Sequence, residues 1–159
     1  MDKRLIDALN AQIKHEFTNF VIYKNFSGIA DFQSLLGAVS WFEKQSEEEK
    51  QHFECFYSFL CDVGTIPVMP AVEEQPNKNI SLLEMFEKTV KIELGTSDML
   101  QKLHDLAVML KEGSAIDMIE KYLNEQVEEV KTVTDIYNRL KIAGNGLGTI
   151  IIDQELGKR

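Results

Sequence analysis

Four carboxylates and one histidine interrupt the apolar faces of four predicted helices. These residues are Glu16, Glu49, His52, Glu93 and Glu129. Each follows or precedes a large hydrophobic residue by three, four or seven positions, so its side chain shares the face that points toward the core. A buried carboxylate costs much free energy unless it is paired or binds a metal. Glutamates and a histidine that converge near the midpoints of four helices therefore indicate a di-metal site.

The spacing within the second helix specifies how one residue serves two ions. Glu49 and His52 form a Glu-x-x-His pair on one helical face, so both can bind one metal while Glu49 bridges to a second. Di-metal carboxylate bundles take single glutamates from two helices and a Glu-x-x-His pair from each of the others. Glu16 and Glu93 fit the single glutamates, but the fourth helix offers Gln126-x-x-Glu129 instead of a second histidine. Ligands rich in carboxylate favour hard or borderline cations, with iron as the redox-active candidate.

Each of these elements has an ordinary structural explanation when it is taken alone. A single Glu-x-x-His on a helix is usually a solvated face, and the acidic runs at 47–49 and 125–129 resemble surface charge. A buried His52 on its own is more often a hydrogen-bonded core residue than a ligand. The combination differs because four separate helices interrupt their own apolar face at the same height.

The rest of the sequence predicts an all-α four-helix bundle with one long crossover and a short fifth helix at the C-terminus. The whole of residues 1–159 is expected to form a single domain. The expected helices span about 2–30, 35–63, 81–111, 115–142 and 147–156, with a crossover loop at 64–80. Ser81 and Glu84 predict a capping box at the start of the third helix. The apolar residues of the four long helices that are expected to face inward include Leu9, Ile13, Phe20, Tyr23, Phe42, Phe56, Phe59, Phe86, Val90, Leu100, Ile119, Tyr122, Val133, Ile136 and Leu140.

Charge and hydropathy exclude several classes of partner. The formal net charge of −9 argues against nucleic acid, since phosphate binding requires clustered Lys and Arg. No apolar run approaches the roughly 20 residues that span a bilayer, and Met1 to Arg4 does not begin like a secretory signal. A cytoplasmic protein that binds no membrane is expected. Cys55 and Cys61 are six positions apart, which fits neither a zinc site nor a redox pair, so both are expected to be buried thiols.

Five segments together resemble the non-haem ferritins of prokaryotic type across essentially the full chain. These segments are Glu16 with Tyr23 two turns later, residues 45–52, residues 91–93, residues 122–129 and residues 152–156. The resemblance implies that Glu16, Glu49 and His52 hold a first iron, and that Glu49, Glu93 and Glu129 hold a second, with Gln126 nearby. It further implies a third, inner iron site at Glu48, Glu125, Glu128 and Glu129. Tyr23 matches a tyrosine that the family uses for electron transfer.

The function implied by this resemblance is iron storage. Ferrous iron is oxidised at the di-iron centre by dioxygen or hydrogen peroxide, and ferric mineral is stored in a hollow shell of twenty-four identical subunits. Bacterioferritins differ because they carry a second Glu-x-x-His where this chain has Glu129. They also bind haem through a methionine where this chain has Lys50, so no haem is expected.

Two other functions and one structural alternative remain open at this level. A di-iron oxidase or peroxidase of the bacterioferritin or rubrerythrin kind would use the same centre without storing mineral. A metal-free interaction bundle would leave the four glutamates buried and unpaired. The segment around Ile150 to Ile152 either lines the four-fold axes of a shell or packs as a plain tail.

Overall fold

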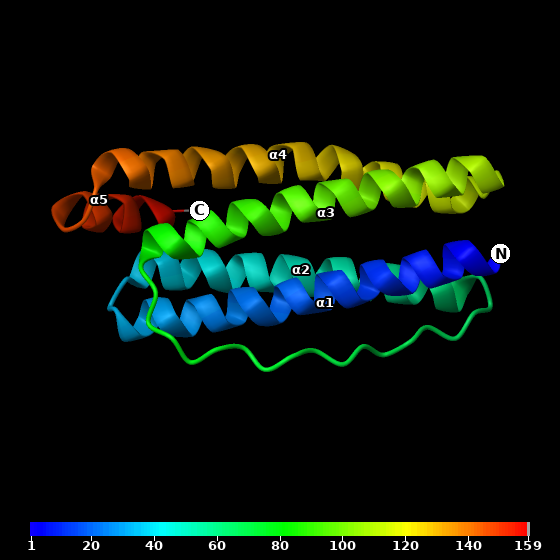
Figure 1. Ribbon diagram of the computed structural model, residues 1–159, viewed down its shortest axis with the longest axis horizontal. Coiled ribbons are helices and arrows are strands. Elements are labelled where there is room, and N and C mark those ends of the chain that lie inside the picture. Colours follow the sequence, from blue (N-terminus) through cyan, green and yellow to red (C-terminus); the bar gives the residue numbers. More distant parts are fainter. Residues whose placement is uncertain (159) are drawn as a thin grey trace.

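The computed structural model describes residues 1–158, and every regular element within that range is helical. The helices are α1 (Lys3–Phe32), α2 (Leu36–Asp62), α3 (Leu82–Leu110), α4 (Gly113–Ala143) and α5 (Leu147–Leu156). The four long helices form a bundle, and α5 packs at one end of it (Figure 1). The predicted fold class is therefore confirmed. No helix in the described range is long and apolar enough to cross a membrane.

The connections determine the direction of each helix. A short turn joins α1 to α2, and Gly64 follows the end of α2 with a positive φ of 74°, which glycine adopts without strain. The chain then runs along the outside of the bundle before α3 begins, so α3 is parallel to α2 (Figure 1). The capping box is present: Glu84 N–H donates to Ser81 Oγ (3.2 Å), and Ser81 N–H donates to Glu84 Oε2 (2.8 Å).

Two helix ends differ by two residues from the expected positions, and the others differ by at most one. The first helix continues past Ala30 to Phe32, since neither Asp31 nor Phe32 breaks a helix. The fourth begins at Gly113, before the expected Ala115, because the first turn of a helix needs no intrahelical partner for its N–H groups and so accommodates Gly113 and Ser114.

The hydrophobic core consists of two separate clusters. One surrounds Tyr23, Phe42 and Phe86 at the end of the bundle that carries α5. The other surrounds Leu9 and Phe56 at the opposite end. Because each long helix contributes to both clusters, the residues between them form a level that crosses the middle of the bundle.

Four expected core positions, Phe20, Phe59, Val90 and Ile136, are only partly buried. Phe59, Val90 and Ile136 still pack against the core clusters, whereas Asn19 and Leu60, the neighbours of Phe20 and Phe59, are buried. An α-helix has 3.6 residues per turn, so a row of side chains spaced three or four residues apart drifts slowly around the helix axis. Farther along the helix, the residue that faces the core is therefore the neighbour of the one expected. Cys61 is exposed and Cys55 is half-buried, so the expectation of two buried thiols is also wrong.

The C-terminal helix is fixed to the start of α2. No side chain of its own caps α2, and Asp153 of α5 accepts a hydrogen bond from Ala38 N–H at 2.7 Å. Gly37 allows this approach because a Cβ at that position would lie 1.7 Å from the Asp153 carbonyl oxygen. The docking of α5 therefore depends on a residue without a side chain.

Gly37→Ala is expected to lower the free energy of unfolding by about 1–3 kcal/mol or more, because the backbones of α2 and α5 must separate. This corresponds to a fall in melting temperature of roughly 2–4 °C for each kcal/mol. Gly28→Ala is the matched control, since a Cβ there meets no atom within 4 Å. In this helix interior it should stabilise by about 0.5–1 kcal/mol. Equal thermal melts for the two variants would contradict the docking of α5 on α2.

Candidate metal centre

The level between the two hydrophobic clusters is polar. Glu16, Glu49 and Glu93 are each at most 1% exposed, Gln126 is 3% exposed and His52 is 9% exposed. Glu129 as a whole residue is only partly buried, although its carboxylate oxygen Oε2 is fully buried. The sequence expectation that these side chains face the core thus matches their burial.

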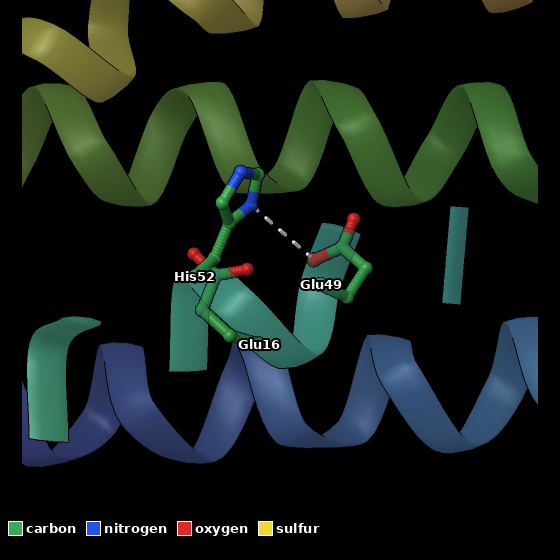
Figure 2. A group of neighbouring side chains, drawn as sticks. All are labelled: Glu16, Glu49 and His52. Carbon is green, nitrogen blue, oxygen red and sulfur yellow. Dashed lines mark ion pairs between the residues drawn. The ribbon is translucent and has the colours of Figure 1, made fainter. Parts of the chain in front are cut away.

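Two groups of potential ligands share one carboxylate. Ligand atoms of Glu16, Glu49 and His52 lie within 4.8 Å of one another, and so do those of Glu49, Glu93 and Glu129. Figure 2 shows Glu16 from α1 converging with Glu49 and His52 from α2, where His52 Nδ1 approaches Glu49 Oε2 at 3.9 Å. This arrangement could hold two cations side by side with Glu49 between them.

Neighbouring side chains fix two of the carboxylates in place. Gln12 Nε2 donates to Glu16 Oε1 at 2.6 Å. Tyr23 Oη donates to Glu93 Oε1, while Gln126 Nε2 donates to Glu93 Oε2 at 2.7 Å and to its backbone oxygen at 3.1 Å. Tyr23 and Gln126 thus clamp Glu93 from α1 and α4.

Two carboxylate oxygens have no hydrogen-bond donor. Glu16 Oε2 and Glu129 Oε2 are buried without one, and no Lys or Arg within residues 1–158 forms an ion pair with either residue. Burial of a carboxylate oxygen is costly in free energy unless the oxygen is protonated or binds a cation. The donor set, four carboxylates and one imidazole, is chemically suited to a hard or borderline divalent cation.

Crowding and burial perturb the acidity of these groups. Burial raises the pKa of Glu16 to about 7, and it raises the pKa of Glu49 well above its usual value, with the charges of Glu16 and Glu93 adding to the effect. Burial is also the main cause that raises the pKa of Glu129 to about 9, followed by the charge of Glu93. Without a cation, the cluster therefore retains protons at neutral pH.

His52 is held in its neutral form. Burial lowers the pKa of His52 despite the nearby acidic charges of Glu125 and Glu48. Its ring packs edge-on against Tyr122, with ring centroids 5.1 Å apart. A neutral imidazole of fixed orientation is the form that binds a metal.

The three remaining predicted metal ligands lie outside these two groups. Glu48 is partly exposed, and Glu125 and Glu128 are exposed. Glu48 and Glu125 are close enough for their charges to raise the pKa of Glu129, which places them beside the second group. A third site built from Glu48, Glu125, Glu128 and Glu129 stays a prediction.

Several polar residues around the centre were not among the predicted site residues. Gln12 and Asn19 on α1 and Thr96 on α3 are each 1–2% exposed, and His15 is partly buried beside Thr96. Gln12 and Asn19 lie four before and three after Glu16, so the helical spacing that identified the carboxylates could have identified these amides as well.

Comparison with known proteins agrees with this architecture. Residues 6–143 match the ferritin-like domain family. A bacterial non-heme ferritin of Escherichia coli is 28% identical over 96% of this chain and 93% of its own length. A bacterial non-heme ferritin of Staphylococcus saprophyticus is 30% identical over 100% of this chain and 96% of its own length. The structure of an open pore ferritin from Archaeoglobus fulgidus has a TM-score of 0.95 at 28% identity and covers 100% of this chain and 98% of that one. The chain therefore belongs to the ferritin family, and the bacterial relatives named above are non-haem ferritins.

Proposed function

We propose that this protein is an iron-storage ferritin with ferroxidase activity. The observation that carries the proposal is the pair of ligand groups that share Glu49. In this assignment Glu16, Glu49 and His52 bind the first ferrous ion, and Glu49, Glu93 and Glu129 bind the second, with Gln126 orienting Glu93. Iron is the substrate, and no haem takes part.

Charge balance explains why such a centre binds ferrous iron and then releases the product. Two ferrous ions bring four positive charges, which the four carboxylates of the two ligand groups neutralise. Each ion gives up one electron. Together with two protons, the two electrons reduce either dioxygen to hydrogen peroxide or hydrogen peroxide to two waters. The ferric pair then has two positive charges that the carboxylates do not balance, so it must take up hydroxide or oxide. This favours its transfer to a mineral.

Tyr23 is the proposed source of a further electron. Its hydroxyl donates to Glu93 Oε1, and burial raises the pKa of Tyr23 well above its usual value, so the phenol stays protonated. Loss of an electron would make that proton strongly acidic, and Glu93 Oε1 is placed to accept it. With two electrons from the di-iron pair and one from a ferrous ion at the proposed third site, the Tyr23 electron would complete the four that, with four protons, reduce dioxygen to two waters. A later ferrous ion would then reduce the tyrosyl radical.

The wider proposal is a homo-oligomeric shell of twenty-four subunits in the cytoplasm, each a single domain of residues 1–159, that encloses ferric mineral. The ferritin relatives of similar length support it. One sample tests it: purified protein is loaded aerobically with ferrous iron, and its particle mass and iron content are measured together. A shell-sized particle that contains far more iron than the di-iron sites can hold is expected. Small particles that oxidise iron without accumulating it would identify a non-storing oxidase or peroxidase instead.

The third site is separable from the di-iron centre. Glu48→Ala and Glu128→Ala should still oxidise the first pair of ferrous ions in each subunit at a rate near that of the wild type, since neither residue belongs to the two ligand groups. The stoichiometry of oxygen consumed per iron, or the later turnover, should change. Stopped-flow absorbance with an oxygen electrode measures both. If either variant lost the initial oxidation as fully as a Glu49 variant does, no distinct third site would exist.

A further inference from the structure

A polar network between α1 and α3 lies directly behind the candidate metal centre. Asn19 and Thr96 are each 2% exposed, and His15 is partly buried at the outer edge of the network. His15 Nε2 lies 2.8 Å from Thr96 Oγ1, and Asn19 Nδ2 lies 3.4 Å from the same oxygen. Polar side chains are costly in a helix–helix contact unless they hydrogen-bond with one another, as these three do.

The direction of the hydrogen bond between Asn19 and Thr96 follows from the donors available. Thr96 has one hydroxyl hydrogen, which it can donate either to the Ile92 carbonyl at 3.1 Å or to His15 Nε2 at 2.8 Å, according to the tautomer of His15. In both arrangements Thr96 Oγ1 accepts from the Asn19 amide. Asn19 must turn its NH₂ group, and not its carbonyl, toward Thr96. The orientation of the Asn19 amide is thereby fixed.

The second hydrogen of this amide reaches the centre. Asn19 Nδ2 donates to Glu49 Oε2 at 3.4 Å. This is also the oxygen that His52 Nδ1 approaches at 3.9 Å, so it faces the group formed by Glu16, Glu49 and His52. Both Asn19 hydrogen bonds are long, at 3.4 Å, and their acceptors lie on different helices, α2 and α3.

We propose that Asn19 is a positioning residue for the Glu49 carboxylate, and that Thr96, backed by His15, holds the Asn19 amide in the orientation that this requires. The inference deepens the proposed ferroxidase function and rests on it. A fixed donor on Glu49 Oε2 favours the charged carboxylate and restricts its rotation, so the shared ligand is already arranged for two cations. Partners of this kind, outside the ligands themselves, typically change metal affinity or activity by about 10–100-fold.

Cobalt(II) titration tests the proposal without relying on oxidation. The visible absorption of cobalt reports the geometry of its ligands, and the titration gives its affinity. Asn19→Leu removes the donor at similar volume, and Thr96→Val removes the hydroxyl that orients it. Thr96→Ser restores that hydroxyl. Thr89→Val is the matched control, because Thr89 is also buried on α3 and donates to the carbonyl four residues earlier, Met85, at 3.0 Å.

Asn19→Leu is expected to weaken cobalt binding by about 10–100-fold and to alter the visible spectrum. Thr96→Val should weaken cobalt binding by a smaller factor and alter the visible spectrum in the same direction. Thr96→Ser and Thr89→Val should match the wild type in both affinity and spectrum. Wild-type spectra and affinities in both Asn19→Leu and Thr96→Val would overturn the proposal, as would an equal loss in Thr89→Val. Wild-type protein that takes up no cobalt and oxidises no ferrous iron would instead refute the metal centre as a whole.

Discussion

Glu49→Ala is expected to reduce the rate of ferrous oxidation at least about 100-fold while the bundle stays folded. Loss of a residue that supports a ligand already costs about 10–100-fold, and Glu49 is a candidate ligand of both ions. The fold should survive, because burial and the charges of Glu16 and Glu93 already raise the pKa of Glu49. Its removal relieves repulsion in the metal-free protein. Stopped-flow absorbance after mixing with ferrous iron and dioxygen measures the rate.

Glu47→Ala provides the control for this substitution. Glu47 lies on the same helix, is exposed and forms an ion pair with Lys50 at 3.3 Å. Its substitution therefore removes a negative charge without changing either ligand group. The variant should oxidise iron at the wild-type rate. Rapid oxidation retained in Glu49→Ala, with a circular dichroism spectrum like that of the wild type, would place the oxidation centre elsewhere in the molecule.

The stability of the metal-free protein is expected to fall as the pH rises from 5 to 8. The folded-state pKa is about 7 for Glu16 and about 9 for Glu129, both above the usual value for glutamate. The folded state therefore retains protons that the unfolded state releases. The stability that this provides is fully present below the unfolded pKa and is lost as the pH rises through the folded pKa. A loss of about 2 kcal/mol would lower the melting temperature by roughly 4–8 °C.

A bound cation should reverse this loss. Zinc binds only the folded centre and pairs with the charges that repel one another, so it stabilises the fold by mass action. Thermal melts at fixed protein concentration should show a larger zinc effect at pH 8 than at pH 5, and little effect in Glu49→Ala. An equal zinc effect in wild type and variant would mean that the ions bind the acidic surface.

The fold was predictable because its determinants are local in sequence. Periodic apolar residues, the Ser81–Glu84 capping box and the break at Gly64 determine the helices and their order. The exact inward face was less predictable, since Phe20 and Asn19 are adjacent and only packing decides which is buried. Packing of the C-terminal segment as a plain tail was one of two alternatives, but its docking position on α2 was not predictable, because it depends on a contact between Gly37 and Asp153, residues far apart in the chain.

The same contrast holds for the candidate site. Glu16, Glu49, His52, Glu93 and Glu129 were identifiable because a carboxylate or an imidazole on an apolar face is conspicuous in a sequence. Thr96 was not, because a small polar residue in a helix has many ordinary roles. Helical spacing places Asn19 near the face of Glu16, but only the three-dimensional structure reveals that its amide donates both to Glu49 Oε2 and to Thr96 Oγ1.

Iron is expected to bind at two buried positions that share Glu49. An anomalous difference map, recorded at the iron absorption edge from crystals soaked in ferrous iron, would locate the bound ions. Two peaks are expected in each subunit, one in contact with Glu16, Glu49 and His52 and the other with Glu49, Glu93 and Glu129. Peaks only at exposed carboxylates such as Glu125 and Glu128, with none between the helices, would show that iron does not bind at the buried centre.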